Sequence, residues 1–231
     1  MGIDVWKKLF SCAMSQIKQA NIPKNSWSFG GGTVLMHKFN HRMSKDIDIF
    51  FLDKQLFSYV SPRVNDALED IMIDFVEQDN FTKIYLQDGE IDFIFSPQIS
   101  KCKPSLTTIE GKSIYVDSPV EIVAKKIEYR AEEFKARDIF DLSIVYFNLR
   151  NSLLKNIFLN QDKISSLKLR IDQIEKSEIL EIELNNIYKL PGADKIKGKE
   201  FALCKDFIAS MEKQFEFDKK FSRVRDTGLL R

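Results

Sequence analysis

The sequence has few cysteines, and it has no excess of charge of either sign. Its three cysteines, Cys12, Cys102 and Cys204, lie far apart and form no Cys-x-x-Cys pair. This spacing disfavours both a zinc site and a disulfide framework, and it predicts reduced thiols in a cytoplasmic protein. The formal net charge is only +1. No overall field would therefore attract nucleic acid, and an RNA would have to be bound by a local patch.

Long apolar runs are also lacking. No run approaches the roughly 18 residues that a membrane span requires, and residues 1–8 lack the basic start and apolar stretch of a signal peptide. We therefore expect a cytoplasmic protein with no membrane contact. The composition is that of a globular protein, because 44% of the residues are hydrophobic and 19 of the 231 are Phe. This is enough apolar side chain to build a core.

The hydrophobic pattern changes near residue 118. Before it, strand-like runs alternate with amphipathic helices, and after it the pattern is mostly helical. Ser118, Pro119 and Glu121 form a strong helix start, with an N-cap serine, a first-turn proline and a capping-box glutamate. We predict an α+β fold, in which residues 1–117 form a small mixed sheet flanked by helices and residues 118–231 form a helical domain. The predicted strands are 27–29, 46–51, 71–77, 83–87, 90–95, 106–109 and 113–116. The predicted helices are 3–21, 34–39, 55–70, 118–130, 135–142, 151–160, 163–189 with a break, and 196–217.

A run of three glycines is the most distinctive local pattern. Gly30, Gly31 and Gly32 follow a short predicted strand and enter a predicted helix. Glycine accepts a positive φ and lets a ligand approach the main chain closely, so this turn suits a phosphate group at a helix N-terminus. Thr33 follows, and we expect it either to cap the helix or to contact a phosphate oxygen.

Two acids follow in residues 46–51, where acidic and apolar residues alternate. In a strand, this alternation places Asp46 and Asp48 on one face and the apolar residues on the other. Two carboxylates so placed can hold a divalent cation. Asp92 is the one polar residue within 91–95, and its burial would be unfavourable unless it were paired or bound to metal. We predict that Asp92 pairs across the sheet with Asp46 and Asp48; the alternative is an aspartate at the sheet rim that faces water.

These motifs together resemble those of a known family. Residues 31–33, Gly-Gly-Thr, followed by Arg-x-Ser-x-Asp-x-Asp at 42–48, resemble the first signature of the DNA polymerase β-like nucleotidyltransferase superfamily. In particular, Gly-Gly-Thr-Val-Leu at 31–35 with His-Arg-Met-Ser-Lys-Asp-Ile-Asp-Ile-Phe at 41–50 is similar to the AbiEii/AbiGii toxin family of bacterial toxin–antitoxin and phage-defence systems. The resemblance covers about residues 25–150. It implies a polymerase β-like domain followed by a helical domain that closes the nucleotide cleft.

The second half carries the later signatures of the resemblance. Residues 121–127 and 137–142 are similar to a family lysine on one helix and an Arg-Asp-x-x-Asp-Leu on the next. The resemblance implies that Lys126 contacts the phosphates of the nucleotide and that Asp138 is the final catalytic acid, with Lys125 and Asp141 as alternatives. The two aspartates are also spaced to share one helix face. A structural ion pair with Arg130 or Arg137 is an equally good explanation of them.

Nucleotidyl transfer explains the acidic and glycine motifs together. Asp46, Asp48 and Asp92 would hold two Mg²⁺ ions, or Mn²⁺, about 3.5 to 4 Å apart, which neutralise the phosphoryl oxygens. Asp92 would also help to deprotonate the attacking hydroxyl. The N–H groups of Gly31, Gly32 and Thr33 would bind the phosphates of the NTP. We also expect Arg42 to contact a phosphate of the nucleotide or an RNA. Ser44 is expected either to contact a phosphate of the nucleotide or to orient the entry to the strand.

The resemblance implies a function and a partner. We expect a metal-dependent nucleotidyltransferase that transfers a nucleotide from an NTP to an acceptor, with the 3′ end of a tRNA as the expected acceptor, and that acts as a toxin opposed by a cognate antitoxin. One alternative is transfer to a protein or a small molecule. Another is an inactive nucleotide-binding regulator, against which the intact Asp46, Asp48 and Asp92 argue.

Overall fold

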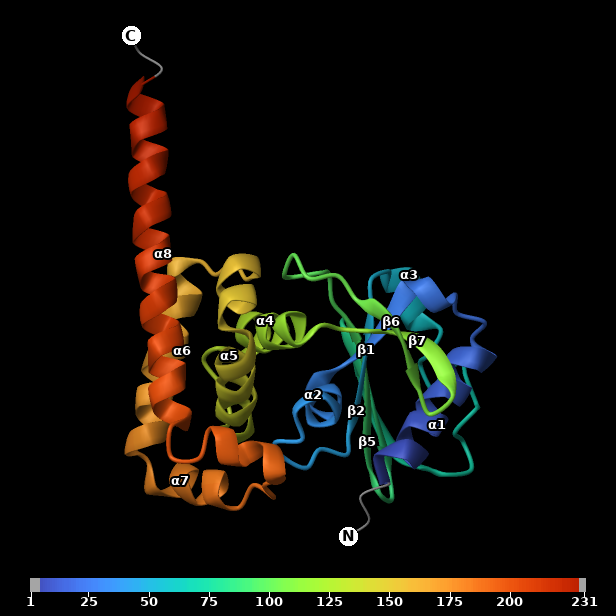
Figure 1. Ribbon diagram of the computed structural model, residues 1–231. Helices are drawn as coiled ribbons and strands as arrows, with labels where there is room; N and C mark the ends of the chain where they lie inside the picture. Colours follow the sequence, from blue (N-terminus) through green and yellow to red (C-terminus); the bar gives the residue numbers. More distant parts are fainter. Residues whose placement is uncertain (1–4, 229–231) are drawn as a thin grey trace. The chain divides into compact units, whose positions relative to one another are not determined.

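The chain folds into two compact units. The computed structural model describes residues 5–228, and Figure 1 shows it as a ribbon. The first unit contains residues up to 122 together with Tyr188–Gly192, and the second contains residues 123–187 and those from 193 onward. The predicted α+β class is confirmed, because a mixed seven-stranded sheet with flanking helices is followed by helices. Within residues 5–228, no helix is both long enough and apolar enough to span a membrane.

The first unit is built on the sheet. Its strands have the spatial order β3-β4-β5-β2-β1-β7-β6, and helices α1 and α2 lie on opposite sides of it (Figure 1). The strands are β1 Trp27–Gly30, β2 Ile47–Phe51, β3 Met72–Gln78, β4 Phe81–Leu86, β5 Gly89–Phe95, β6 Ser105–Ile109 and β7 Lys112–Val116. The helical segments are α1 Val5–Gln19, η1 Lys24–Ser26, α2 Gly31–Phe39 and α3 Lys54–Ser58.

Apolar side chains of the central strands form the core of this unit. Strand β2 pairs antiparallel with β1 and parallel with β5, and helices α1 and α2 pack on it. Phe29 of β1 packs on Phe10 of α1, with ring centroids 5.3 Å apart. Each large side chain buried in this way contributes about 1.5 to 3 kcal/mol. The fully buried apolar residues of these strands are Phe29, Ile47, Ile49, Phe51, Ile91 and Phe93.

The second unit is helical. Helix α5 packs on α8, α6 packs on α8, and α7 contacts both α5 and α6; Figure 1 shows α5, α6 and α8. Helix α4 begins in the first unit and continues in the second. The helical segments are α4 Pro119–Arg130, α5 Ala136–Asn156, α6 Gln161–Lys176, α7 Glu178–Asn185, η2 Pro191–Lys195 and α8 Glu200–Gly228.

Three predicted elements are wrong. The helix expected over 55–70 stops at Ser58, because Pro62 disfavours helix before it and the Asn65 side chain donates hydrogen bonds to the carbonyls of Gln16 and Tyr59. No separate helix spans 151–160, since α5 continues to Asn156 across a kink at Leu149. Asp46 lies just before strand β2 rather than within it.

Candidate active site

The glycine turn connects strand β1 to helix α2. Gly31 has a φ of +72°, a conformation that favours glycine. A Cβ on Gly31 would lie only 1.8 Å from Oδ2 of Asp48. A Cβ on Gly32 would lie 2.6 Å from Nη2 of Arg42 and 2.8 Å from Oγ of Ser44. Polar side chains therefore contact the turn where only glycine fits, with Asp48 at Gly31 and with Arg42 and Ser44 at Gly32.

One row of cross-strand partners extends this cluster over the sheet. Gly30 of β1 is paired with Asp48 of β2, Asp48 with Asp92 of β5, and Asp92 with Lys83 of β4. Side chains of direct partners lie on the same face of a sheet, about 5 Å apart. The register thus makes Asp92 the immediate neighbour of Asp48.

Asp46 lies next to this row and is held in two ways. Its Oδ1 accepts a hydrogen bond from the backbone N–H of Glu90, with an N···O distance of 3.3 Å. Its backbone carbonyl accepts one from Oγ1 of Thr33 at 2.6 Å. Thr33 is fully buried and supports the segment that enters β2. Its predicted contact with phosphate stays a prediction.

The pKa of Asp92 is shifted by its surroundings. Its pKa is raised to about 6, first because burial disfavours the charged form and second because Asp48 is close, while Lys83 opposes the rise. Both carboxylate oxygens of Asp92 lie 3.1 Å from Nζ of Lys83. Nevertheless, among the described residues none donates a hydrogen bond to the buried Oδ1. A carboxyl with a pKa near neutrality can accept a proton from a reacting hydroxyl.

The chemistry of this site fits a divalent cation. Asp46, Asp48 and Asp92 supply oxygen ligands of the kind that Mg²⁺ and Mn²⁺ prefer, and the buried Oδ1 of Asp92 is an acceptor that a cation would satisfy. Within residues 5–228, no three acidic, histidine or cysteine side chains converge closely enough to hold a metal ion as they stand. The ammonium group of Lys83 is the cation that contacts Asp92 here.

Arg42 and Ser44 lie on the segment that joins α2 to β2. The Arg42 side chain is buried, and its Nη1 donates a hydrogen bond to the carbonyl of Met43 at 3.1 Å. The Ser44 backbone N–H contacts the sulfur of Met36 at 3.2 Å, and its hydroxyl is 3.2 Å from that of Thr33. This segment carries both residues to the glycine turn.

A second cluster of predicted site residues lies in the second unit. Nζ of Lys126 is 2.6 Å from Oδ1 of Asp138 and 3.0 Å from Oδ2 of Asp141, and Nη2 of Arg130 is 2.7 Å from Oδ1 of Asp138. Both aspartates are fully buried. Burial alone would raise the pKa of Asp138, but the positive charges of Lys126 and Arg130 outweigh it and lower the pKa. Lys125, the alternative lysine, is also buried.

Two residues at the site were not predicted. Lys83 lies opposite Asp92, as described above. Asp117 follows β7, which runs parallel to β1, and is buried beside Gly30; it accepts a hydrogen bond from the Ser28 hydroxyl at 2.6 Å. The signal for Asp117 was an acid directly after an apolar strand, but the partner of that strand cannot be read from local sequence.

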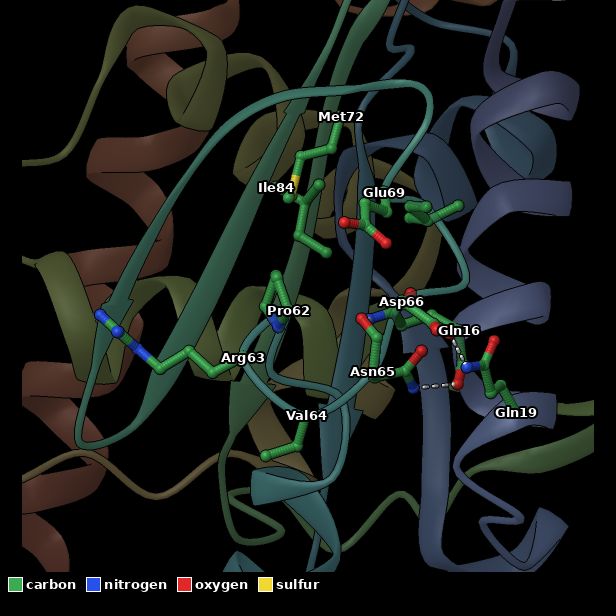
Figure 2. A pocket seen from close by; sticks show the side chains of 11 residues that line it. Gln16, Gln19, Pro62, Arg63, Val64, Asn65, Asp66, Glu69, Met72 and Ile84 are labelled. Atoms are coloured by element: carbon green, nitrogen blue, oxygen red, sulfur yellow. Dashed lines mark hydrogen bonds between the residues drawn. The ribbon is translucent and has the colours of Figure 1, made fainter.

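A separate cavity of about 460 Å³ lies elsewhere in the first unit. It is bounded by the end of α1, the 62–69 loop and strands β3 and β4, as Figure 2 shows. Asn65 and Gln16 are joined there by hydrogen bonds. The residues that line the cavity are different from the predicted site residues. They are Gln16, Gln19, Pro62, Arg63, Val64, Asn65, Asp66, Leu68, Glu69, Met72 and Ile84.

Comparison with known proteins gives one family match. The family described as "Nucleotidyl transferase AbiEii toxin, Type IV TA system" matches residues 14–187, about three quarters of the chain. No curated protein matches the sequence.

Several solved structures resemble the chain weakly. JHP933 from Helicobacter pylori has 15% identity and a TM-score of 0.45, with 94% of this chain and 97% of that chain covered. The nucleotidyltransferase toxin MenT4 from Mycobacterium tuberculosis has 14% identity and a TM-score of 0.40, with 94% of each covered. The antibiotic-resistance factor ANT(2'')-Ia has 14% identity and a TM-score of 0.40, with 94% and 96% covered.

Proposed function

The chain belongs to the AbiEii family of nucleotidyl transferase toxins of type IV toxin–antitoxin systems and is a nucleotidyltransferase, and from this premise we propose that it transfers a nucleotide from an NTP to the 3′ end of a tRNA with the help of divalent cations. The observation that carries the metal-dependent site is the register that sets Asp92 beside Asp48, with Asp48 in contact with Gly31. The tRNA acceptor and a cognate antitoxin partner are proposed from the family. Because NTP and tRNA are cytoplasmic, we place the reaction in the cytoplasm.

The residues of the first unit have separate roles in the proposed reaction. The backbone N–H groups of the glycine turn bind the phosphates of the NTP, and the guanidinium of Arg42, which lies against Gly32, neutralises them. Asp46, Asp48 and Asp92 hold the cations. A divalent cation bound there supplies charge neutralisation at the phosphoryl oxygens and lowers the pKa of the acceptor hydroxyl.

In the transfer step, one bond to phosphorus forms, one breaks, and a residue of this chain takes the released proton. The acceptor oxygen forms a bond to the α-phosphorus while the bond from that phosphorus to the pyrophosphate oxygen breaks. The proton of the acceptor hydroxyl passes to Asp92, the carboxylate that the strand register places beside Asp48. Two predicted roles are retained, that of Lys126 at the phosphates of the nucleotide and that of Asp138 as a catalytic acid.

The proposal is tested by following the label from an NTP. The purified protein is incubated with Mg²⁺, total RNA and each labelled NTP in turn, and the products are separated. We expect label in tRNA. Label on a protein or on a small molecule would identify that molecule as the acceptor in place of tRNA. The absence of label from every acceptor would favour a nucleotide-binding regulator.

Asp48→Asn is the matched variant for this assay. It removes a predicted metal ligand while keeping the shape of the side chain, so transfer should fall by roughly 100-fold or more. The variant should unfold at nearly the same temperature as the wild type, because Asp48 is partly exposed and its removal relieves repulsion with Asp92. Retained transfer in Asp48→Asn would reject the site.

A further inference from the structure

Lys83 occupies a special position in the row of partners across the sheet. It lies on β4 directly opposite Asp92, and Asp92 is in turn next to Asp48. Its ammonium group contacts both oxygens of Asp92 at 3.1 Å and also bonds to the carboxylate of Glu90. The Lys83 side chain is only 24% exposed, so water screens these contacts incompletely.

Negative charge exceeds positive charge among the groups that contact one another at Lys83. Glu90 and Asp92 contact its ammonium group directly, and Asp48 and Asp46 follow along the same part of the sheet. Two carboxylates therefore share one ammonium group, and a third, that of Asp48, lies next to Asp92. Such a surplus of negative charge still favours a divalent cation. However, a cation that bound Asp92 would meet the ammonium group on the same two oxygens.

We propose that Lys83 is an internal counter-ion, which takes the place of a cation at Asp92 and competes with the divalent metal for it. This inference rests on the proposed metal-dependent function. Glu90 gives the ammonium group a second partner, so Lys83 moves away from Asp92 without losing its ion pair. The affinity of the site for metal is accordingly lower than three carboxylates alone would produce. Lys83 is a positioning residue in this scheme, because it acts through Asp92.

A purely structural role for Lys83 makes a different prediction. If the lysine only joined β4 to β5, its removal would change the stability of the first unit and leave cation binding unchanged. The affinity for Mn²⁺ therefore distinguishes the two roles, and it can be measured without any transfer reaction. Mn²⁺ is suitable because its free ion is detected directly by electron paramagnetic resonance.

The experiment compares Mn²⁺ binding to four full-length proteins. Lys83→Met removes the charge and keeps the length of the side chain. Lys83→Arg keeps the charge, and Lys8→Met removes an exposed lysine that pairs with Asp88 instead. At about pH 8.5, where carboxylates are ionised, we expect Lys83→Met to bind Mn²⁺ about tenfold more tightly, the size of effect that one nearby charge has on an ionisable site. Lys83→Arg and Lys8→Met should bind like the wild type.

The outcomes separate this inference from the proposed function. Unchanged or weaker Mn²⁺ binding by a folded Lys83→Met protein, with binding by the wild type intact, would overturn the role of Lys83 alone. If Lys83→Met were unfolded by circular dichroism, tighter binding by Lys83→Gln would decide in favour of the inference and equal binding would overturn it. If neither the wild type nor the variants bound Mn²⁺, both the metal dependence and the inference would be rejected.

Discussion

At the scale of single residues, Asp138 and Asp141 are two fully buried carboxylates that share the ammonium group of Lys126. Nη2 of Arg130 donates a hydrogen bond to Oδ1 of Asp138. Such a network explains why an acidic pair is tolerated inside a helical core, since buried charges must be paired. It also means that a role of Lys126 in stability has to be measured before a role at the nucleotide can be assigned.

Lys126→Met should destabilise the protein and do so in a pH-dependent way. The variant removes the ammonium group that both buried carboxylates contact, and we expect a loss of about 3 kcal/mol at neutral pH. The lowered pKa of Asp138 means that its ionised form stabilises the wild type above the pKa of the unfolded chain, and that this contribution is lost as the pH falls through the folded pKa. The difference between wild type and variant should therefore shrink below about pH 4.

Urea unfolding at neutral and acidic pH measures this difference. Lys168→Met is the control, because Lys168 forms an exposed ion pair with Glu212 at 2.8 Å and its loss should change stability little. An equal loss of stability at both pH values would contradict the linkage to Asp138. Unchanged stability with weaker NTP binding would instead assign Lys126 to the nucleotide alone.

At the scale of elements, the segment Tyr188–Gly192 holds the segment that carries Arg42. The chain returns to the first unit there and pairs with residues 40–43, with Arg42 opposite Lys189 in an isolated antiparallel bridge. Backbone hydrogen bonds join Met43 to Tyr188 at 2.9 Å, Leu190 to His41 at 3.0 Å and Gly192 to Asn40 at 2.6 Å. Arg42 reaches the glycine turn from this paired segment.

Gly192→Ala should weaken NTP binding through this contact. A Cβ on Gly192 would lie 2.0 Å from the carbonyl oxygen of Phe39, so the two segments must separate and Arg42 loses its support. We expect an NTP affinity about tenfold lower, comparable to the loss of one charge-assisted phosphate contact, measured by calorimetry. Tyr188→Ala is the control, since that side chain is 68% exposed and the backbone pairing remains. Equal affinity of Gly192→Ala and wild type would show that the segment does not position Arg42.

At the scale of the whole molecule, the predicted site residues belong to two compact units. The glycine turn and the three aspartates belong to the first unit, and Lys126 and Asp138 belong to the second. The chain carries a net charge of only +1. An RNA acceptor therefore has to be bound by local groups rather than by the overall field.

Hydrogen exchange with and without NTP and Mg²⁺ should reveal which elements contact the nucleotide. Ligands that bind the native state suppress local opening, so the amides of Gly31–Phe39 and Ile47–Phe51 should exchange more slowly. If Lys126 contacts the nucleotide, α4 should also be protected. Helix α6 and the 62–69 loop beside the cavity should be unchanged, and they serve as the internal control. Protection confined to the 62–69 loop would move the nucleotide site to that cavity.

Several features of the fold could be predicted from short stretches of residues. Gly31, the alternation around Asp48 and the helix start at Pro119 each depend on a few neighbouring residues, whose φ preferences, periodicity and capping act at short range. These motifs were sufficient to predict the α+β class and the family. The choice of Asp46, Asp48 and Asp92 as metal ligands also came from them and stays a prediction.

The residues that meet across the sheet could not be predicted from short stretches of sequence, because they depend on the strand register of the folded chain. A hairpin turn at Asp88 and Gly89 would set Tyr85 opposite Asp92, whereas the turn at Gln87 and Asp88 sets Lys83 there. Moving a turn by one residue moves every cross-strand partner by two, and local sequence does not resolve that step. Likewise, Asp117 reaches Gly30 because β7 runs beside β1, and Tyr188–Gly192 reaches Arg42 from far along the chain. Such contacts depend on the packing of the complete fold, because no short-range pattern encodes them.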